Sequence, residues 1–305
     1  MKTIRTFMPA AVLLLAAAFL LTFSHRSSAQ EAESSVIVSS VKYDSLYSYN
    51  AQLYIIRPVG KDGVSGKEEK LPCIMYVQGS AWKKQNMAAA VRRMIPMAEK
   101  GYVVACVEYR PCSEALFPAQ AEDAKTATRF MRAHAAGYGI DPDNIFAWGG
   151  SSGGHTVLLQ SLTQDSDLLD NGHLGEYPCS VRAVVDYFGP SELVREFRIR
   201  DGYQEKPDAN GGLLLGDPVW EKRDIALKAS PLYYVHPYAV PTFIVHGDRD
   251  EVVPLEQSTS LAERFRECGA PYELLILEGE AHGTPGFWTE EMYSKVDAFF
   301  RKHLK

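Results

Sequence analysis

A pair of serines flanked by glycines, Ser151 and Ser152, lies between two segments of different character. Residues 144–148 form a short apolar run that indicates a β-strand, and residues 152–162 have the composition of a helix. A G-x-S-x-G pattern in this setting is typical of a nucleophile elbow, a strained turn that exposes a serine hydroxyl at the carboxyl edge of a sheet. The alternative is a glycine-rich turn that binds an anion or no ligand. The pattern fits in two registers, Gly149-x-Ser151-x-Gly153 and Gly150-x-Ser152-x-Gly154.

Two later segments carry the partners that a serine nucleophile needs. A serine hydroxyl attacks a carbonyl only when a base removes its proton and a carboxylate orients that base. Residues 242–246 indicate a strand that runs into an acidic turn with Asp248 and Asp250. Residues 273–277 indicate another strand, which runs into a loop that carries His282. Serine, acid and histidine thus follow three strand ends, which predicts a catalytic triad at one edge of a sheet.

The elements that must position these side chains alternate along the chain. Alternation of near-continuous apolar strands with helices predicts a mainly parallel sheet with helices on both faces. The expected strands are residues 51–58, 72–77, 102–108, 144–148, 181–186, 242–246 and 273–277. The expected helices are residues 87–99, 119–136, 152–162 and 255–268, and a last one that ends near Leu304. The strand at 51–58 alternates in polarity and is expected to be antiparallel.

From about Leu71 to the C-terminus, the sequence resembles α/β-hydrolases of the esterase/lipase group. It is similar to the secreted acetyl-xylan and feruloyl esterase-like members, which are carbohydrate esterases. The resemblance implies the α/β-hydrolase fold and serine esterase activity without a metal or organic cofactor. The motifs that carry it include Val107-Glu-Tyr-Arg-Pro111, Trp148-Gly-Gly-Ser-Ser-Gly-Gly-His155, His246-Gly-Asp-Arg-Asp250 and Ala281-His-Gly283.

The resemblance also chooses between the open alternatives. In the family pattern the nucleophile precedes small-Gly-Gly-His, which implies Ser151 and leaves Ser152 to contribute its backbone N–H to the oxyanion hole. The acid is the second aspartate of the His-Gly-x-x-Asp turn, which implies Asp250 rather than Asp248. The base is then His282.

The loop after residues 72–77 departs from the family pattern, which is His-Gly-Gly-x-Trp. Here it runs from Gln78 to Trp82 as Gln-Gly-Ser-Ala-Trp, and the second oxyanion donor is expected to be the backbone N–H of Ser80 or Ala81. A serine adopts a positive φ less readily than glycine, so we expect an altered loop geometry. Gln78, Trp82 and Tyr187 are expected to contact substrate, and the alternative for Trp82 is a packed loop anchor.

The N-terminus has the features of a secretory signal peptide. Lys2 and Arg5 precede an apolar run at residues 10–23, and Ser27-Ser28-Ala29 offers small residues for cleavage. We expect cleavage after Ala29 and a secreted or periplasmic protein. The apolar run is too short to favour an uncleaved membrane anchor, which is the alternative.

The rest of the chain has the length of one domain. Of 305 residues, 46% are hydrophobic and 23% are charged, which is ordinary for a globular protein. We expect residues 30–50 to be a linker or lead-in and residues 51–305 to form the hydrolase domain. Residues 192–230 do not fit the alternation, and we expect them to form a cap-like insertion that walls the pocket. The alternative is a surface excursion without substrate contact.

Charge and cysteine content exclude some classes of partner. Removal of residues 1–29 takes away three basic residues and no acidic one, so the net charge changes from −6 to −9. An acidic surface argues against nucleic acid and against stable association with anionic membranes. The five cysteines have no metal-binding spacing, and Cys112 with Cys179 could pair in an oxidising compartment.

These observations together predict a secreted serine esterase. It is expected to remove a short acyl group, acetyl or aryl, from a small-molecule or polysaccharide ester. One alternative is a peptidase or amidase of the same fold. The other is a catalytically silent, hydrolase-like binding protein.

Overall fold

The computed structural model describes residues 36–49, 51–59, 70–194 and 209–305. The chain divides into two units, Met1–Ser34 and Ser35–Lys305. The expected signal peptide at residues 1–29 lies outside the described residues, so the description below concerns the second unit.

Eight strands form one sheet in the described part of the chain. The β1–β2 and β2–β4 pairs are antiparallel, and all other neighbouring pairs are parallel. The predicted mainly parallel sheet is therefore confirmed. In spatial order the strands are β1 Val36–Lys42, β2 Gln52–Pro58, β4 Val103–Val107, β3 Leu71–Val77, β5 Ile140–Gly150, β6 Val184–Tyr187, β7 Thr242–Gly247 and β8 Tyr272–Leu277.

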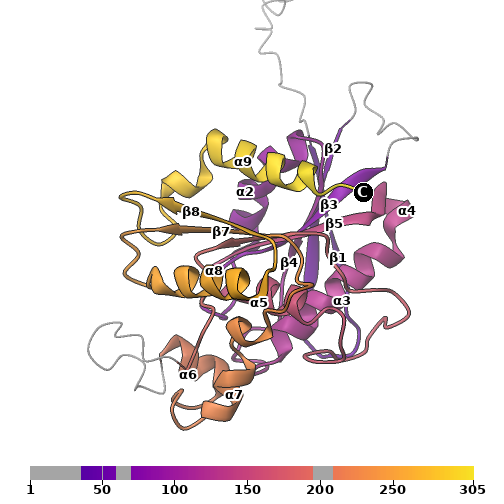
Figure 1. Cartoon of the computed structure of the whole chain (residues 1–305). Helices are drawn as coiled ribbons and strands as arrows, with labels where there is room; N and C mark the ends of the chain where they lie inside the picture. Colours follow the sequence, from indigo (N-terminus) through magenta and orange to yellow (C-terminus); the bar gives the residue numbers. More distant parts are fainter. Residues whose placement is uncertain (1–35, 50, 60–69, 195–208) are drawn as a thin grey trace, which may run out of the picture. The chain divides into compact units, whose positions relative to one another are not determined.

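Helices cover both faces of this sheet, as predicted (Figure 1). One face packs against α2 (Met87–Glu99) and α9 (Glu290–Lys302). The other packs against α3 (Ala119–Ala133), α5 (Ser152–Leu162) and α8 (Glu256–Cys268). Successive side chains of β3 alternate between the two cores, since Cys73, Met75 and Val77 face one and Ile74 and Tyr76 face the other. Burial on both faces explains why the central strands are apolar at almost every position.

The sheet begins earlier than the sequence analysis expects. Within the segment expected to be a lead-in, β1 pairs with β2 along its whole length, from Val36 opposite Pro58 to Lys42 opposite Gln52. All side chains of β1 are exposed or half-buried, and two serines interrupt its apolar residues, so it lacks the continuous apolar run of the central strands. Backbone hydrogen bonds to β2, rather than burial, hold this edge strand in place.

The helix predicted at residues 119–136 is also interrupted. It ends at Ala133, and a separate short helix, α4, spans Ala135–Tyr138. Two short 3₁₀ helices, η2 at Pro231–Tyr234 and η3 at Pro285–Trp288, precede β7 and α9 respectively.

The expected insertion at 192–230 is described only up to residue 194 and from residue 209. Its described part contains α6 (Asn210–Leu215) and α7 (Arg223–Lys228), which the sequence analysis did not predict. Leu214 and Leu215 pack with Ala226 and with Trp82 of the loop after β3 in a small separate hydrophobic cluster. The insertion is thus joined by buried contacts to the loop that is expected to form the oxyanion hole.

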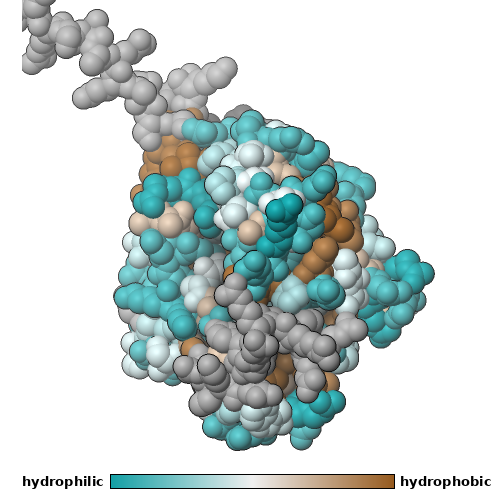
Figure 2. Space-filling view, turned by 90° about the vertical axis from the view of Figure 1, so that its left-hand side faces the viewer, coloured by the Kyte–Doolittle hydropathy of each residue, from teal (hydrophilic) through white to brown (hydrophobic). Residues whose placement is uncertain are grey.

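The surface of the molecule and its cysteines complete the description of the fold. The face drawn in Figure 2 is mostly hydrophilic, with hydrophobic patches among the polar residues. None of the described helices is both long enough and apolar enough to cross a bilayer. All five cysteines lie among the described residues, and each is a free thiol. The disulfide between Cys112 and Cys179 that the sequence allowed is therefore absent from this structure.

Candidate active site

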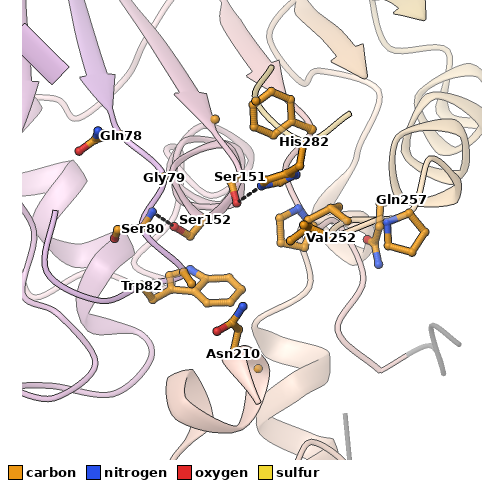
Figure 3. Close-up of a pocket in the computed structure, with 18 of the residues that line it drawn as sticks. Gln78, Gly79, Ser80, Trp82, Ser151, Ser152, Asn210, Val252, Gln257 and His282 are labelled. Atoms are coloured by element: carbon orange, nitrogen blue, oxygen red, sulfur yellow. Dashed lines mark hydrogen bonds between the residues drawn. The ribbon is translucent and has the colours of Figure 1, made fainter. Parts of the chain in front are cut away.

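Ser151 occupies the turn between β5 and α5, with backbone angles φ 55° and ψ −127°. A residue with a side chain rarely adopts a positive φ, and such a conformation costs roughly 1–3 kcal/mol. Two backbone hydrogen bonds hold it, from the Ser151 N–H to the Tyr187 carbonyl at 2.8 Å and from the His155 N–H to the Ser151 carbonyl at 3.0 Å. The turn presents the Ser151 side chain to the pocket shown in Figure 3.

Both glycines that flank Ser151 are required by close packing. A Cβ atom on Gly149 would lie 2.2 Å from the Gly153 carbonyl oxygen, and one on Gly153 would lie 2.0 Å from the Val77 carbonyl oxygen. Both positions therefore exclude any other residue. A Cβ on Gly150, in the alternative register, would meet its nearest atom at 3.4 Å. The backbone thus requires glycine on both sides of Ser151, in the pattern Gly149-x-Ser151-x-Gly153.

Gly153→Ala is expected to destabilise the protein by about 3 kcal/mol or more, because the methyl group displaces β3 or α5. Gly137→Ala is the matched control, since a Cβ there meets nothing within 4 Å. Urea denaturation of both variants measures the difference. Equal stability of the two variants would contradict the packing described for the elbow.

His282 lies between Ser151 and Asp250. Its Nε2 is 2.9 Å from Ser151 Oγ, and its Nδ1 is 2.6 Å from Asp250 Oδ2. Since a carboxylate only accepts, Nδ1–H donates to Asp250 and Nε2 accepts the serine proton. The structure therefore brings the three predicted residues into one hydrogen-bonded chain, from the loops after β7 and β8 and the turn after β5.

The side chain of Asp250 is fully buried. Its Oδ1 accepts the backbone N–H groups of Val252 and Val253, both at 2.8 Å. A second histidine, His246, lies 3.4 Å from Oδ2 and donates from Nε2 to the Val253 carbonyl at 2.8 Å. Burial raises the pKa of Asp250, but the hydrogen bonds from His246 and His282 outweigh it and hold that pKa well below its usual range. Asp250 is therefore ionised wherever His282 has to be oriented.

The rival residues have other partners. Asp248 Oδ1 accepts the Gly279 N–H at 2.7 Å and makes no hydrogen bond to a described histidine. His155 accepts the Trp82 Nε1–H at Nδ1, at 3.2 Å, and donates from Nε2 to the Ala229 carbonyl at 2.7 Å. Burial lowers the pKa of His155 to about 4, so this ring is neutral and fully occupied. His155 therefore serves local packing, and the bond to Trp82 makes that tryptophan a loop anchor.

The candidate oxyanion hole corresponds to one of the two expected arrangements. Among the described residues, the backbone N–H groups of Ser152 and Ala81 have no hydrogen-bond acceptor, and both residues line the pocket. The Ser80 N–H instead donates to the Ser152 hydroxyl at 2.9 Å (Figure 3). Of the two expected second donors, Ser80 is thus occupied in this structure, which leaves Ala81 beside Ser152.

The altered loop carries its strain at other residues than expected. Ala81 and Trp82 adopt positive φ values of 54° and 55°, whereas Ser80 does not. The Ser80 hydroxyl donates to the Lys83 carbonyl at 2.6 Å and lies 2.8 Å from the Tyr109 hydroxyl. These polar contacts hold the Ser80 side chain in place, and the positive φ values of the turn fall at the next two residues.

A cavity of about 690 Å³ opens over Ser151 and His282. Gln78 and Trp82 line it, as expected, although Gln78 Oε1 also accepts the Asn86 N–H at 2.9 Å. Tyr187 does not line it: its ring is buried among Trp148, Phe287 and Trp288, so its expected contact with substrate is wrong. The next residue, Phe188, lines the pocket instead and packs on His282 at a ring distance of 4.6 Å.

Several lining residues were not expected from the sequence. They come from strand β3, from helices and from turns, at positions without a motif, and only the packing of the chain shows that they face the cavity. They are Tyr76, Arg93, Asn210, Val252, Gln257 and Trp288.

A second buried carboxylate lies beneath the elbow. Asp186 on β6 accepts the Gly189 N–H at 3.1 Å, and its other oxygen has no partner among the described residues. Burial raises the pKa of Asp186 to about 7, against smaller opposing effects of His246 and the Gly189 N–H. In the unfolded chain this group loses its proton near pH 4. The folded state keeps this proton to a higher pH than the unfolded chain does. The contribution of Asp186 to the free energy of unfolding therefore falls as pH rises from about 4 to about 7.

Asp186→Asn removes this titration. The melting temperature of the variant minus that of the wild type is therefore expected to increase by several degrees as pH rises from 4.5 to 8. Thermal unfolding at a series of pH values measures the gap between the two proteins. Melting curves that shift in parallel across the whole range would contradict a raised pKa at Asp186.

Comparison with known proteins agrees with this architecture. A family model described as BD-FAE matches residues 64–265. Among curated proteins, the chain is 29% identical over 215 residues to Esterase LipQ of Mycobacterium tuberculosis, covering 66% of this chain and 47% of that protein. It is 23% identical over 248 residues to isoprenylcysteine alpha-carbonyl methylesterase ICME of Arabidopsis thaliana, covering 80% and 56%. The chain spans about half the length of these curated relatives.

Solved structures match over more of their length. The chain superposes on a structure titled "Truncated form of carbohydrate esterase from gut microbiota" with a TM-score of 0.74 and 30% identity, covering 89% of this chain and 98% of that one. It superposes on a propionate-bound thermophilic esterase from Thermogutta terrifontis with a TM-score of 0.71 and 24% identity, covering 88% and 94%. The predicted α/β-hydrolase fold is confirmed.

Proposed function

The chain belongs to the BD-FAE family, and from that membership and the geometry of its site we propose that it is a serine hydrolase of carboxylic esters. The observation that carries the proposal is the hydrogen-bonded chain from Asp250 through His282 to Ser151 at the wall of a cavity. These are the groups that nucleophilic acyl transfer requires, in mutual hydrogen-bond reach.

In the proposed mechanism, Ser151 Oγ attacks the ester carbonyl while His282 Nε2 takes its proton. Asp250, ionised and buried, stabilises the imidazolium that forms. The negative oxygen of the tetrahedral intermediate accepts hydrogen bonds from the Ser152 and Ala81 N–H groups. Collapse of this intermediate breaks the bond to the alcohol, which leaves with the proton from His282 and leaves Ser151 acylated. Water then attacks the acyl-enzyme and gives a proton to His282. Collapse of the second intermediate breaks the bond to Ser151 Oγ, which takes the proton from His282 as the acid is released.

The substrate is proposed to be a short acyl ester, acetyl or aryl, on a carbohydrate. Two observations support this class. The 30% identical structure is titled a carbohydrate esterase, and the cavity is large enough for more than a minimal ester. Ala81 and Trp82 line the same cavity as Ser151, and the bond from Trp82 to His155 holds the indole in place.

On p-nitrophenyl esters, kcat/KM is expected to be highest for acetyl, lower for butyryl and low for octanoyl. A lipase would gain from each extra methylene, by about 0.8 kcal/mol where the pocket accepts it. Initial rates over the series at fixed pH test this order. Activity that rises through octanoyl contradicts the short-acyl proposal.

A fluorophosphonate probe separates the proposal from its alternatives. It is expected to label the wild-type protein at Ser151, because the probe reacts with an activated serine. A silent binding protein would not be labelled. A peptidase or amidase would be labelled but would hydrolyse p-nitroanilides as well as the matching esters.

We also propose that the protein is secreted or periplasmic, with residues 1–29 removed, and that its partner is the ester substrate rather than nucleic acid or membrane. The basic residues, the apolar run and the Ser-Ser-Ala segment support this. N-terminal sequencing of the protein recovered outside the cytoplasm tests it, and Gln30 is the expected first residue.

A further inference from the structure

One wall of the cavity contains a cation that the mechanism above does not use. Arg93, on α2, lines the pocket together with Tyr76 of β3 and Trp288 of η3. Its guanidinium carbon lies 4.0 Å from the centre of the Trp288 ring, which is stacking distance for a cation–π contact. Gly79 and Gly283 line the same cavity, so this wall belongs to the pocket of Ser151 and His282.

Arg93, which is half-buried, differs in its partners from the two buried arginines of the described residues. Arg110 is paired with Asp123 at 2.8 Å, and Arg129 is paired with Asp170 at 2.5 Å. No carboxylate of the described residues lies within ion-pair distance of Arg93. The charge instead faces aromatic rings, and the neighbouring Tyr76 hydroxyl is neutral because burial raises its pKa well above the usual value.

The position of Arg93 is also well supported. Its backbone carbonyl accepts the Tyr293 hydroxyl at 2.8 Å, which ties α2 to α9. Its guanidinium is stacked on Trp288, so less side-chain entropy is lost when it binds an anion. A guanidinium without a carboxylate partner, in a pocket walled by aromatic rings, is favourable for a planar anion that it can bind through two N–H groups.

We propose that Arg93 binds a carboxylate of the substrate, so that the preferred esters carry a second, ionised carboxyl group. The carboxylate lies against the Tyr76–Trp288 wall while the ester carbonyl is at Ser151. This inference rests on the proposed esterase function and adds the charge class of its substrate.

Two ester pairs test this, because the carboxylate can lie on either side of the scissile bond. In the first pair it is on the alcohol side: 4-acetoxybenzoate against its neutral methyl ester. In the second it is on the acyl side: monomethyl terephthalate against methyl 4-methylbenzoate. Each variant is compared with wild type on the same ester, so the intrinsic reactivity of the ester cancels.

Arg93→Met removes the charge and keeps an apolar stem over Trp288, and Arg93→Gln is a second variant in case the first is poorly folded. Arg92→Met is the matched control, since Arg92 is the neighbouring exposed arginine on α2. Both Arg93 variants are expected to lower kcat/KM on at least one anionic ester by about tenfold or more, and on its neutral partner by less than about twofold. Arg92→Met is expected to change neither, and the wild-type preference is expected to weaken with salt.

Equal losses on both members of each pair would overturn the proposal and leave Arg93 as a support for Trp288. The proposal would also be overturned if the ratio of kcat/KM on the anionic ester to kcat/KM on its neutral partner were the same in wild type and in the Arg93 variants, for both pairs. Calorimetric titration with terephthalate gives a readout independent of catalysis: binding to wild type that is lost in both Arg93 variants supports the subsite even if no ester is hydrolysed. Failure of the esterase proposal is recognised separately, by absence of both hydrolysis and fluorophosphonate labelling in the wild type.

Discussion

Ser151→Ala is expected to lower kcat/KM on p-nitrophenyl acetate by about 10⁵-fold or more, because no other described hydroxyl lies within hydrogen-bond reach of His282. The variant keeps the backbone N–H groups that face the cavity, so only the activity supplied by binding and the oxyanion donors remains. Steady-state kinetics on protein with a wild-type melting temperature measures the loss. The same variant is expected to lose fluorophosphonate labelling.

Ser152→Ala is the matched control, one residue away. Its backbone N–H is retained, but its hydroxyl no longer accepts the Ser80 N–H or lies 3.3 Å from the Tyr109 hydroxyl. The loss is therefore expected to be small, about tenfold at most, from a less firmly held loop. An inactive Ser152→Ala variant beside an active Ser151→Ala variant would show that the nucleophile has been assigned in the wrong register.

Asp250→Asn is expected to lower kcat by about 10⁴-fold, because the amide can hold the His282 ring in the tautomer that cannot accept the serine proton. The geometry makes the effect specific: the Asp250 side chain is buried, accepts three hydrogen bonds and lies 3.4 Å from His246 Nε2. Kinetics on an activated acetyl ester measures the loss, and circular dichroism shows that the fold is kept.

Asp248→Asn is the control for that change. The Asp248 side chain accepts the Gly279 N–H at 2.7 Å, and an amide oxygen can accept the same bond. Its effect is expected to stay within about threefold, as for a surface substitution with a retained partner. Equal losses in two folded variants would contradict the assignment of Asp250.

The identity of the three candidate catalytic residues could be predicted because each depends on local sequence. Ser151 lies between glycines that a strand-to-helix turn requires, and Asp250 and His282 follow apolar runs that form strands. Parallel strands bring their carboxyl ends to one edge of the sheet, so residues far apart in sequence meet there. The structure adds the distances, and the catalytic roles stay predictions until the variants are measured.

The sequence also determined the central sheet and most of its helices. Strands buried on both faces must be apolar along their whole length, and helices between them show their period. The edge strand β1 could not be recognised in this way, since its side chains are mostly exposed and its stability comes from pairing with β2.

Only the tertiary structure decided the details of the pocket. The Ser80 N–H is taken by the Ser152 hydroxyl from a helix 72 residues later, so the free donor falls at Ala81. Tyr187 and Phe188 are adjacent aromatic residues, and packing against Trp148 buries the first and leaves the second beside His282.

Arg93 is the clearest example of a pocket residue that local sequence cannot identify. On α2 it resembles its neighbour Arg92, and nothing local distinguishes the two. Of the two, only Arg93 contacts the ring of Trp288, which lies almost two hundred residues later in the sequence, and with it lines the pocket. Local sequence sets backbone angles and periodicity, but the partners of a side chain depend on contacts that exist only once distant segments have packed together.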